Sequence, residues 1–501
     1  MSPLFLEVAV LALGIFMVLY EAFASEKEKA LIPWIGIGGL AAVFVASWFV
    51  FPDIPNPNTI LSTFYKADAF ALFFKRFALV ATIIVLVMSV EYKDVLRKFI
   101  YGATPQAGVG EFFSLPVFTC AGLMWMVSAV DFVMIFVSLE LVTISFYVLV
   151  SYTRRNTRSL EAGVKYLILG ALSTGFLVYG ITWIYGITRH TNLDRINEAV
   201  AMLPQGSDQT PLLFGVILVL IALGFKIAAA PFQFWVPDVY QGAPTPVTAF
   251  LSVGSKAAGF VVLLRVLQAF SYMPQISDKL ILVTVILAAF TLIYGNLAAM
   301  PQNNLKRLLA YSSIAHAGYL LVAVASADAN SPNAGVAVSF YLAGYLLMTL
   351  LSFIVMIVVA NHSGGDDIAH FNGLGKRSPQ LAFAMLAAML SLAGVPFTVG
   401  FFGKFLVFEA AVQQHQYLLI GIAIVTVGAG FYYYLKVVRA IYWNEPAEGA
   451  APITVAPLTR VTILALTVLI FLFGVFPQPV LSMLKGPEAA QQNAPLVLNN
   501  R

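Results

Sequence analysis

The chain has 501 residues, of which 60% are hydrophobic and only 10% are charged, and its formal net charge is +4. Soluble domains average roughly 25% charged residues, so a water-soluble fold of this length could not cover its own surface. The small charge, without a dense Lys/Arg cluster, argues against nucleic-acid binding, and the single cysteine, Cys120, excludes intrachain disulfides and cysteine-ligated iron–sulfur or zinc sites.

Apolar runs of about 20 residues recur along the chain without the alternation of strands, and runs of this length form helices that cross roughly 30 Å of hydrocarbon. The first run lacks a basic n-region and a cleavage site, so we expect a retained span rather than a signal peptide. The sequence therefore predicts an all-α membrane protein with about fourteen transmembrane helices, at 4–23, 31–51, 70–90, 112–130, 132–151, 162–186, 211–230, 246–270, 278–300, 307–326, 334–360, 380–410, 416–442 and 459–483.

Positive charges in the connecting loops predict the orientation, because cytoplasmic loops carry an excess of Lys and Arg. The loops after even-numbered spans hold few, and Lys75 and Arg76 stand at the start of span 3. We therefore expect the odd loops in the cytoplasm and both termini on the far side. The odd loops hold Lys27, Lys29, Lys93, Arg97, Lys98, Arg154, Arg155, Arg158, Lys306, Arg307, Lys376 and Arg377.

Two predicted spans are interrupted by proline, which removes a backbone donor and breaks the helical hydrogen-bond ladder. Span 7 runs into Pro231 within AAPFQFWVPDVYQGAPTPV, and span 12 contains Pro396 within SLAGVPFTVGFFGKF. Kinks are common in membrane helices, but paired interruptions in two halves of a transporter indicate a site near the midplane. A lysine beside each break, Lys226 and Lys404, favours the functional interpretation.

A weak internal repeat relates spans 4–8 to spans 9–13. Glu140 and His316 are 176 residues apart, and Lys226 and Lys404 are 178 apart. The Pro-Phe pairs differ by only 165, so Lys226 precedes its break whereas Lys404 follows its own. We expect an N-terminal three-helix segment, two repeats, and a C-terminal helix with a tail, at 1–110, 111–272, 273–443 and 444–501.

Ionisable side chains lie deep in several of these spans, where each costs at least ~2.5–3.5 kcal/mol on insertion scales. Glu140, Lys226, Lys256 and Lys404 are far enough from the span ends that we favour a functional role over structural pairing or snorkelling. His316 also suits a neutral, hydrogen-bonded core histidine. Lys165 follows Glu161 by four residues, the spacing of an ordinary helical ion pair.

The residue types favour proton transfer. Glu, Lys and His exchange protons, whereas Arg practically does not. Making or breaking one Glu–Lys contact shifts proton affinity by roughly 1.4–4 kcal/mol, and moving one proton across 100 mV costs about 2.3 kcal/mol. The sequence has no P-loop, dinucleotide fingerprint, metal-ligand cluster or CxxCH motif, so energy must come from an ion gradient or from partner subunits.

The motif-bearing runs resemble the antiporter-like membrane subunits of respiratory complex I, the NADH–quinone oxidoreductase. The resemblance covers about 110–440 and rests on EAGVKYLILGALSTGFLVYG, GFKIAAAPFQFWVPDVYQGAPTPVTAFLSVGSKAAGF, NLKRLLAYSSIAHAGYLL and SLAGVPFTVGFFGKF. The subunit N branch is the most similar. Subunit M has a glutamate where this chain has Lys404, and subunit L has a long lateral helix for which this chain has no room after span 14.

This resemblance implies two inverted five-helix repeats, each forming a half-channel. Glu140 would modulate Lys226, Lys256 would relay protons centrally, and Lys404 would connect to the exit side. Lys165 is similar to a span-6 lysine of the family, and His316 would belong to the central hydrophilic axis. No cofactor is expected in this chain. NADH, FMN, iron–sulfur clusters and quinone would belong to other subunits, and the partners would be neighbouring membrane subunits in a bacterial inner membrane.

Three alternatives stay open at this point: a subunit of a multi-subunit cation/proton antiporter, a subunit of a membrane-bound hydrogenase, and a structural spacer whose buried charges only hold helices together. Co-purifying proteins distinguish the first two from a complex I subunit. A spacer predicts that loss of Lys226 impairs assembly rather than proton transport.

Overall fold

The computed structural model describes residues 3–25, 27–52, 59–100, 109–204, 208–271, 274–327, 333–446 and 451–484, and every regular element in these ranges is helical. Thirteen helices there are long and apolar enough to cross a membrane. A further crossing is divided between two shorter helices, α18 (Pro379–Ala393) and α19 (Val399–Gln413). The predicted all-α fold with about fourteen spans is confirmed.

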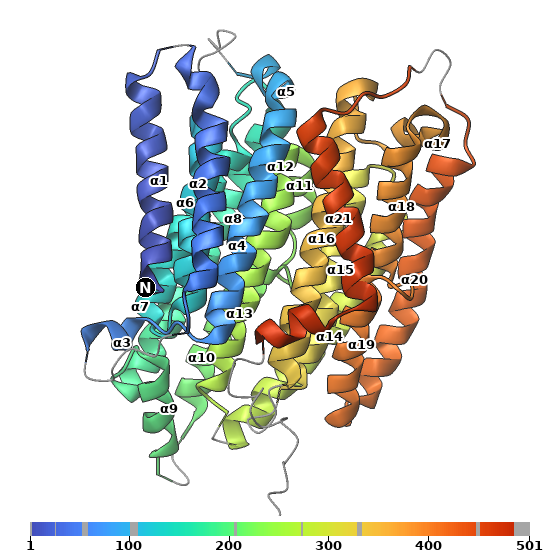
Figure 1. Ribbon diagram of the computed structural model, residues 1–501. Coiled ribbons are helices and arrows are strands. Elements are labelled where there is room, and N and C mark those ends of the chain that lie inside the picture. The colour runs from blue at the N-terminus through green and yellow to red at the C-terminus, as the bar shows by residue number, and fades with distance from the viewer. Residues whose placement is uncertain are drawn as a thin grey trace, which may run out of the picture.

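The long helices run roughly parallel in one bundle (Figure 1). Asp or Asn side chains cap several N-termini, including Asp68 before α4, Asp131 before α7 and Asn304 before α15, where they accept bonds from free backbone N–H groups. The membrane-crossing helices are α1 (Leu4–Phe23), α2 (Ile32–Ala46), α4 (Ala69–Glu91), α6 (Glu111–Ser128), α7 (Phe132–Val150), α8 (Thr157–Thr188), α10 (Thr210–Ile227), α12 (Thr245–Phe250) with α13 (Lys256–Gln268), α14 (Pro274–Ala299), α15 (Leu305–Ala325), α16 (Asn333–Ser363), α20 (Tyr417–Tyr442) and α21 (Pro457–Val475).

Short helices connect the spans at the two ends of the bundle, except α11, which continues the first broken span beyond Pro231. The start of α1 lies at the same end as α3 and α9 (Figure 1). The ranges of the short helices are α3 (Ile60–Phe64), α5 (Lys93–Lys98), α9 (Leu193–Ala201), α11 (Val236–Gly242) and α17 (Leu374–Arg377), with 3-10 turns at Glu28–Leu31, Ser47–Phe49 and Ile368–Phe371.

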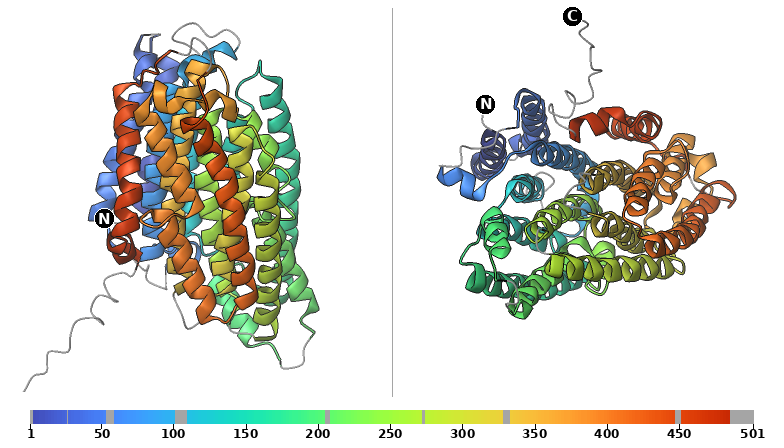
Figure 2. Two further views of the ribbon diagram at one scale, coloured as in Figure 1. Left: turned by 90° about the vertical axis from the view of Figure 1, so that its right-hand side faces the viewer. Right: turned by 90° about the horizontal axis from the view of Figure 1, so that it is seen from below.

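Burial divides the helices into a centre and a periphery. All of the most apolar stretch of α15 is buried, as is nearly all of that in α16 and in α12–α13, whereas only about a third or less is buried in α1, α2, α8, α20 and α21. Viewed along the bundle, α1 and α2 lie at one edge and α20 lies at the other (Figure 2). The peripheral helices expose large apolar side chains such as Phe16, Ile168 and Val425, as a lipid-facing surface requires.

Helix α4 ties the N-terminal segment to the rest of the bundle. It packs against α6 and also against α12, α16 and α21. The three N-terminal spans are therefore part of the same packed body and not a separate layer.

Each predicted break lies where a helix ends in a left-handed residue. Helix α10 stops at Ala228 (φ 64°) before Pro231, and α18 stops at Gly394 (φ 90°) before Pro396. At the second break α18 and α19 approach so closely that a Cβ on Gly400 would lie 1.9 Å from the carbonyl oxygen of Ser391. Only glycine fits at that position.

Candidate functional site

The charged residues that the sequence singles out lie mainly in the centre of the bundle. Lys226, Lys256, His316 and Lys404 are 6%, 2%, 1% and 6% exposed. They come from four different elements, α10, α13, α15 and α19. We call these four residues the central row.

Lys226 stands in the last turn of α10, and its ammonium donates to the hydroxyl of Thr143 on α7. Glu140 lies three residues before Thr143, almost one turn away on the same helix, and its carboxylate accepts a 2.8 Å hydrogen bond from the hydroxyl of Thr174. In the described part of the chain, Glu140 and Lys226 therefore bond to neighbouring hydroxyls and not directly to each other.

Lys256 follows one turn of π-helix, Leu251–Ser255, which joins α12 to α13. Single π-helical turns in α-helices frequently mark functional sites. The ammonium of Lys256 donates to the carbonyl (2.5 Å) and to the hydroxyl of Ser313 on α15, and this hydroxyl also contacts Tyr240 of α11 at 3.0 Å. Lys256 thus bonds across to the helix that carries His316.

His316 is held by two tyrosine hydroxyls. Its Nδ1 lies 2.7 Å from the Tyr341 hydroxyl, and its Nε2 lies 3.0 Å from the hydroxyl of Tyr434, which also contacts the hydroxyl of Ser312. Both ring nitrogens therefore have partners that can donate or accept, so either tautomer is accommodated.

Lys404 turns back toward the break in its own span. Its ammonium donates to the carbonyls of Leu392 (3.1 Å) and Ala393 (2.7 Å), the last residues of α18. A helix C-terminus carries partial negative charge and unsatisfied carbonyls, so it is a suitable site for a cation.

Aromatic rings fill the gaps along the central row. The ring of Tyr345 lies 5.7 Å from the Lys256 ammonium and 5.1 Å from the His316 ring. The ring of Tyr319 lies 6.2 Å from that of His316 and 5.0 Å from the ammonium of Lys404. At the other end, a Cβ on Gly259 of α13 would lie 3.7 Å from the Lys226 Cβ, so α13 passes directly beside Lys226.

Lys165 lies apart from the central row. Its side chain is 41% exposed and forms ion pairs with Glu161 (2.6 Å) and with Asp238 of α11 (2.7 Å). Asp238 also pairs with Arg307 of α15 at 2.9 Å. Exposed pairs of this kind contribute only about 0–1 kcal/mol.

Three buried charges, besides the N-cap residue Asp131, were missed from the sequence. Lys75 and Glu7 form a 2.7 Å ion pair with fully buried side chains, and the Tyr65 hydroxyl bonds to both. Lys306, which we expected in a loop, is buried on α15 and donates to the carbonyl of Ala243 at 2.9 Å. All three stand within eight residues of a span end, where burial and snorkelling cannot be distinguished from sequence position.

The described residues hold no group of three or more His, Cys, Asp or Glu side chains that could bind a metal ion. The chemistry of the central row is therefore that of ammonium, imidazole, phenol and hydroxyl groups. Such groups can pass protons along short hydrogen bonds.

Residues 129–430 match the family model described as NADH:quinone oxidoreductase/Mrp antiporter, transmembrane region. The chain is 40% identical over 428 residues to a protein named NADH-quinone oxidoreductase subunit N from Desulforamulus reducens, with 85% of each sequence covered.

Among solved structures, a chain of respiratory complex I from Thermus thermophilus with bound aureothin is similar with a TM-score of 0.78 and 30% identity. The match covers 96% of the present chain and 100% of the other. A chain of the Mrp complex from a Dietzia species gives a TM-score of 0.80 at 20% identity, over 98% and 97% of the two chains, which shows a shared fold.

Proposed function

The chain belongs to the membrane-subunit family shared by NADH:quinone oxidoreductase and Mrp antiporters, within its subunit N branch, and we propose that protons cross it along the central row. It is a proton-translocating membrane subunit of NADH-quinone oxidoreductase. The observation that carries the proposed path is the arrangement of the buried row: the rings of Tyr345 and Tyr319 join Lys256, His316 and Lys404, and the helix of Lys256 passes directly beside Lys226.

The path begins at Lys226, whose ammonium sits beside the helix that carries Glu140. Breaking the ammonium–Thr143 bond lets Lys226 approach Lys256 on the neighbouring helix, and Glu140 biases which arrangement is populated. Lys404 first releases its proton toward the far side and becomes the neutral amine. A proton then moves to it from Lys256 by way of Ser313 and His316, and Lys226 gives a proton back to Lys256. The mirrored breaks support two five-helix repeats, α6–α13 and α14–α20, related by inversion.

The chain has no redox role in this proposal. NADH, FMN, iron–sulfur clusters and quinone belong to partner subunits, and a conformational or electrostatic signal from them drives the proton steps. The excess of Lys and Arg in the odd loops supports an orientation with both termini on the non-cytoplasmic side. The bacterial subunit N relative named above supports a bacterial inner-membrane location.

The fold shared with the Mrp complex leaves one alternative, a cation/proton antiporter subunit. Purification of the tagged chain from its native membrane separates the two. Flavin and iron–sulfur subunits in the complex support our proposal, whereas small antiporter subunits without them contradict it.

Lys226→Ala tests whether the row conducts or only holds helices together. In membrane vesicles we expect normal assembly and a fall in NADH-driven proton uptake of roughly 10²-fold or more, as for loss of a positioned acid–base group. Lys279→Ala, an exposed lysine on α14, is the matched control and should behave as the wild type. Normal proton uptake by assembled Lys226→Ala would refute the path, and loss of assembly would favour a structural spacer.

A further inference from the structure

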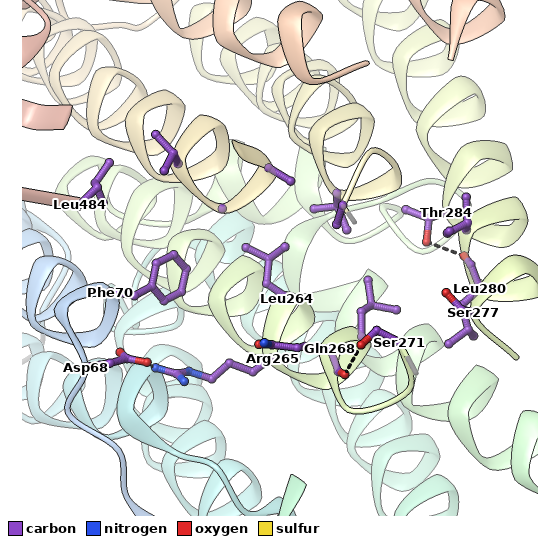
Figure 3. A pocket seen from close by; sticks show the side chains of 17 residues that line it. Asp68, Phe70, Leu264, Arg265, Gln268, Ser271, Ser277, Leu280, Thr284 and Leu484 are labelled. Atoms are coloured by element: carbon purple, nitrogen blue, oxygen red, sulfur yellow. Dashed lines mark hydrogen bonds and ion pairs between the residues drawn. The ribbon is translucent and has the colours of Figure 1, made fainter. Parts of the chain in front are cut away.

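A cavity of about 510 Å³ opens at the end of the bundle where α4 begins and α13 ends. It lies where the N-terminal segment and both repeats meet. Asp68 and Phe70 come from the start of α4, Leu264 and Arg265 from α13, and Leu280 and Thr284 from α14 (Figure 3). None of the proton-transfer residues discussed above lines it.

The cavity lies below the middle of the central row. Arg265 follows Lys256 by nine residues on α13, and Val324, which also lines the cavity, follows His316 by eight on α15. At 1.5 Å per residue these separations are roughly 13 and 12 Å along the helices. These distances are less than half the thickness of the hydrocarbon core of a bilayer, so the middle of the row lies close to the cavity.

An ion pair stands at the edge of the cavity. The guanidinium of Arg265 donates to Asp68 Oδ1 at 2.9 Å, and the Arg265 side chain is only 10% exposed (Figure 3). The Arg265 Nε is buried without a hydrogen-bond partner among the described residues. Buried donors normally have a partner, and the Asp68 carboxylate is the acceptor that the structure gives for this guanidinium.

The lining also contains polar side chains at several depths. Ser271 and Ser277 lie at the helix ends that border the cavity, and Thr284 lies seven residues further along α14 than Ser277, roughly 10 Å deeper. Ordered water needs two or more polar partners, and these hydroxyls with the ion pair provide them.

We propose that this cavity is a second, water-filled exit, beside the route through Lys404, by which protons from Lys256 and His316 reach the far side of the membrane, with Asp68 as the last acceptor on the protein in this branch. The inference rests on the proposed function. A proton leaves the Lys256 ammonium for water in the cavity, binds the Asp68 carboxylate, and passes to bulk water, which returns Lys256 to the neutral amine and Asp68 to the carboxylate. Arg265 keeps its proton throughout and positions Asp68.

Thiol labelling tests whether the cavity holds water. In a Cys120→Ser background, Thr284→Cys should react from the far side with a charged, membrane-impermeant methanethiosulfonate. Ile286→Cys is the matched control and should not react. Ile286 is two residues away on α14, and its side chain is 58% exposed on the outer surface of the bundle. Reaction of Thr284→Cys only with an apolar maleimide would mean that lipid fills the cavity, and it would overturn the proposal.

A plug tests whether the cavity conducts. Gly335 lines it, and a Cβ there meets nothing within 4 Å, so Gly335→Leu should fill space without a clash. Gly421→Leu is the control, since Gly421 is also a helical glycine with open space but lies on the exposed face of α20. We expect NADH-driven proton uptake by the assembled complex to fall with Gly335→Leu and to be unchanged with Gly421→Leu.

Asp68→Asn tests the acceptor. Asparagine preserves the N-cap of α4 and can still accept from Arg265, so assembly should be normal while proton uptake falls measurably but not completely, because the route through Lys404 remains. If Lys256→Gln blocks uptake but Gly335→Leu and Asp68→Asn leave it unchanged, the exit lies elsewhere and only this inference fails. If Lys256→Gln itself pumps normally, the proposed function fails.

Discussion

In both broken spans a helix ends in a left-handed residue, but different side chains donate to the carbonyls near the two helix ends. At the first break the indole N–H of Trp235 donates to the carbonyl of Phe225 at 3.0 Å, near the end of α10. At the second break the Lys404 ammonium donates to the carbonyls of Leu392 and Ala393 at the end of α18. A neutral donor therefore occupies the first helix end and a lysine occupies the second.

This difference explains why the two lysines stand on opposite sides of their breaks. Because Trp235 caps α10, Lys226 is free to bond to Thr143 on α7, beside Glu140. Lys404 has to reach back from α19 to serve as the cap itself. Lys226 is held by a rotatable hydroxyl and can change partners, whereas Lys404 is held by fixed carbonyls and a helix dipole.

The largest expected effect is that of Lys404→Ala. It removes two hydrogen bonds from a charged group, worth about 1.5–3 kcal/mol each before relaxation, and it takes the ammonium donor away from the carbonyls of Leu392 and Ala393. We expect proton uptake to fall to what the cavity branch alone carries, and the purified complex to dissociate at lower temperature than with Lys226→Ala. Equal stability of the two variants would show that the ammonium of Lys404 is no more strongly held than that of Lys226.

Trp235→Phe should affect the first break without removing a charge. The carbonyl of Phe225 loses its indole donor but keeps the backbone N–H of Ala228 at 3.2 Å, so we expect a cost of about 0.5–1.5 kcal/mol. Thermal denaturation of the purified complex should register this loss. Proton uptake per assembled complex should stay near normal, and a loss as large as that of Lys404→Ala would mean that Trp235 takes part in transfer.

Substitutions at the two left-handed residues, Gly394 and Ala228, should give a smaller difference in stability. Gly394→Ala places a Cβ at φ 90° and 2.9 Å from the Lys404 Cδ, so we expect about 1–2 kcal/mol of destabilisation. Ala228 already adopts φ 64°, and Ala228→Gly should change stability by less than about 1 kcal/mol. Denaturation of both variants checks the order, and a larger cost for Ala228→Gly would contradict it.

The smallest effect is expected for Asp238→Asn, on the far half of the first broken span. The ion pairs of Asp238 with Lys165 and Arg307 are more than a third exposed on the Asp238 side, and such pairs are worth about 0–1 kcal/mol. Proton uptake should change by no more than roughly twofold. A large loss of proton uptake would show that Lys165 takes part in proton transfer.

The spans, both breaks and the three lysines of the central row follow from sequence, because a run of 20 apolar residues and a mid-run lysine or proline are strong local signals. The place of His316 came from the family resemblance. The contacts between these side chains could not be predicted from the sequence. Nothing in the sequence places Ser313 against Lys256, or Trp235 at a carbonyl ten residues earlier, since both depend on how separate helices pack. The Glu7–Lys75 pair was missed for the same reason, because each residue alone looks like a charge near a span end.

The central claim is that the buried row carries the pumped protons. Lys256→Gln tests it most directly, because the amide can still donate to Ser313 but cannot carry an exchangeable charge. The decisive measurement is the number of protons translocated per NADH oxidised by the assembled complex in sealed vesicles. Our account predicts a lower ratio, or loss of both activities together. An unchanged ratio at a normal rate of NADH oxidation would contradict it.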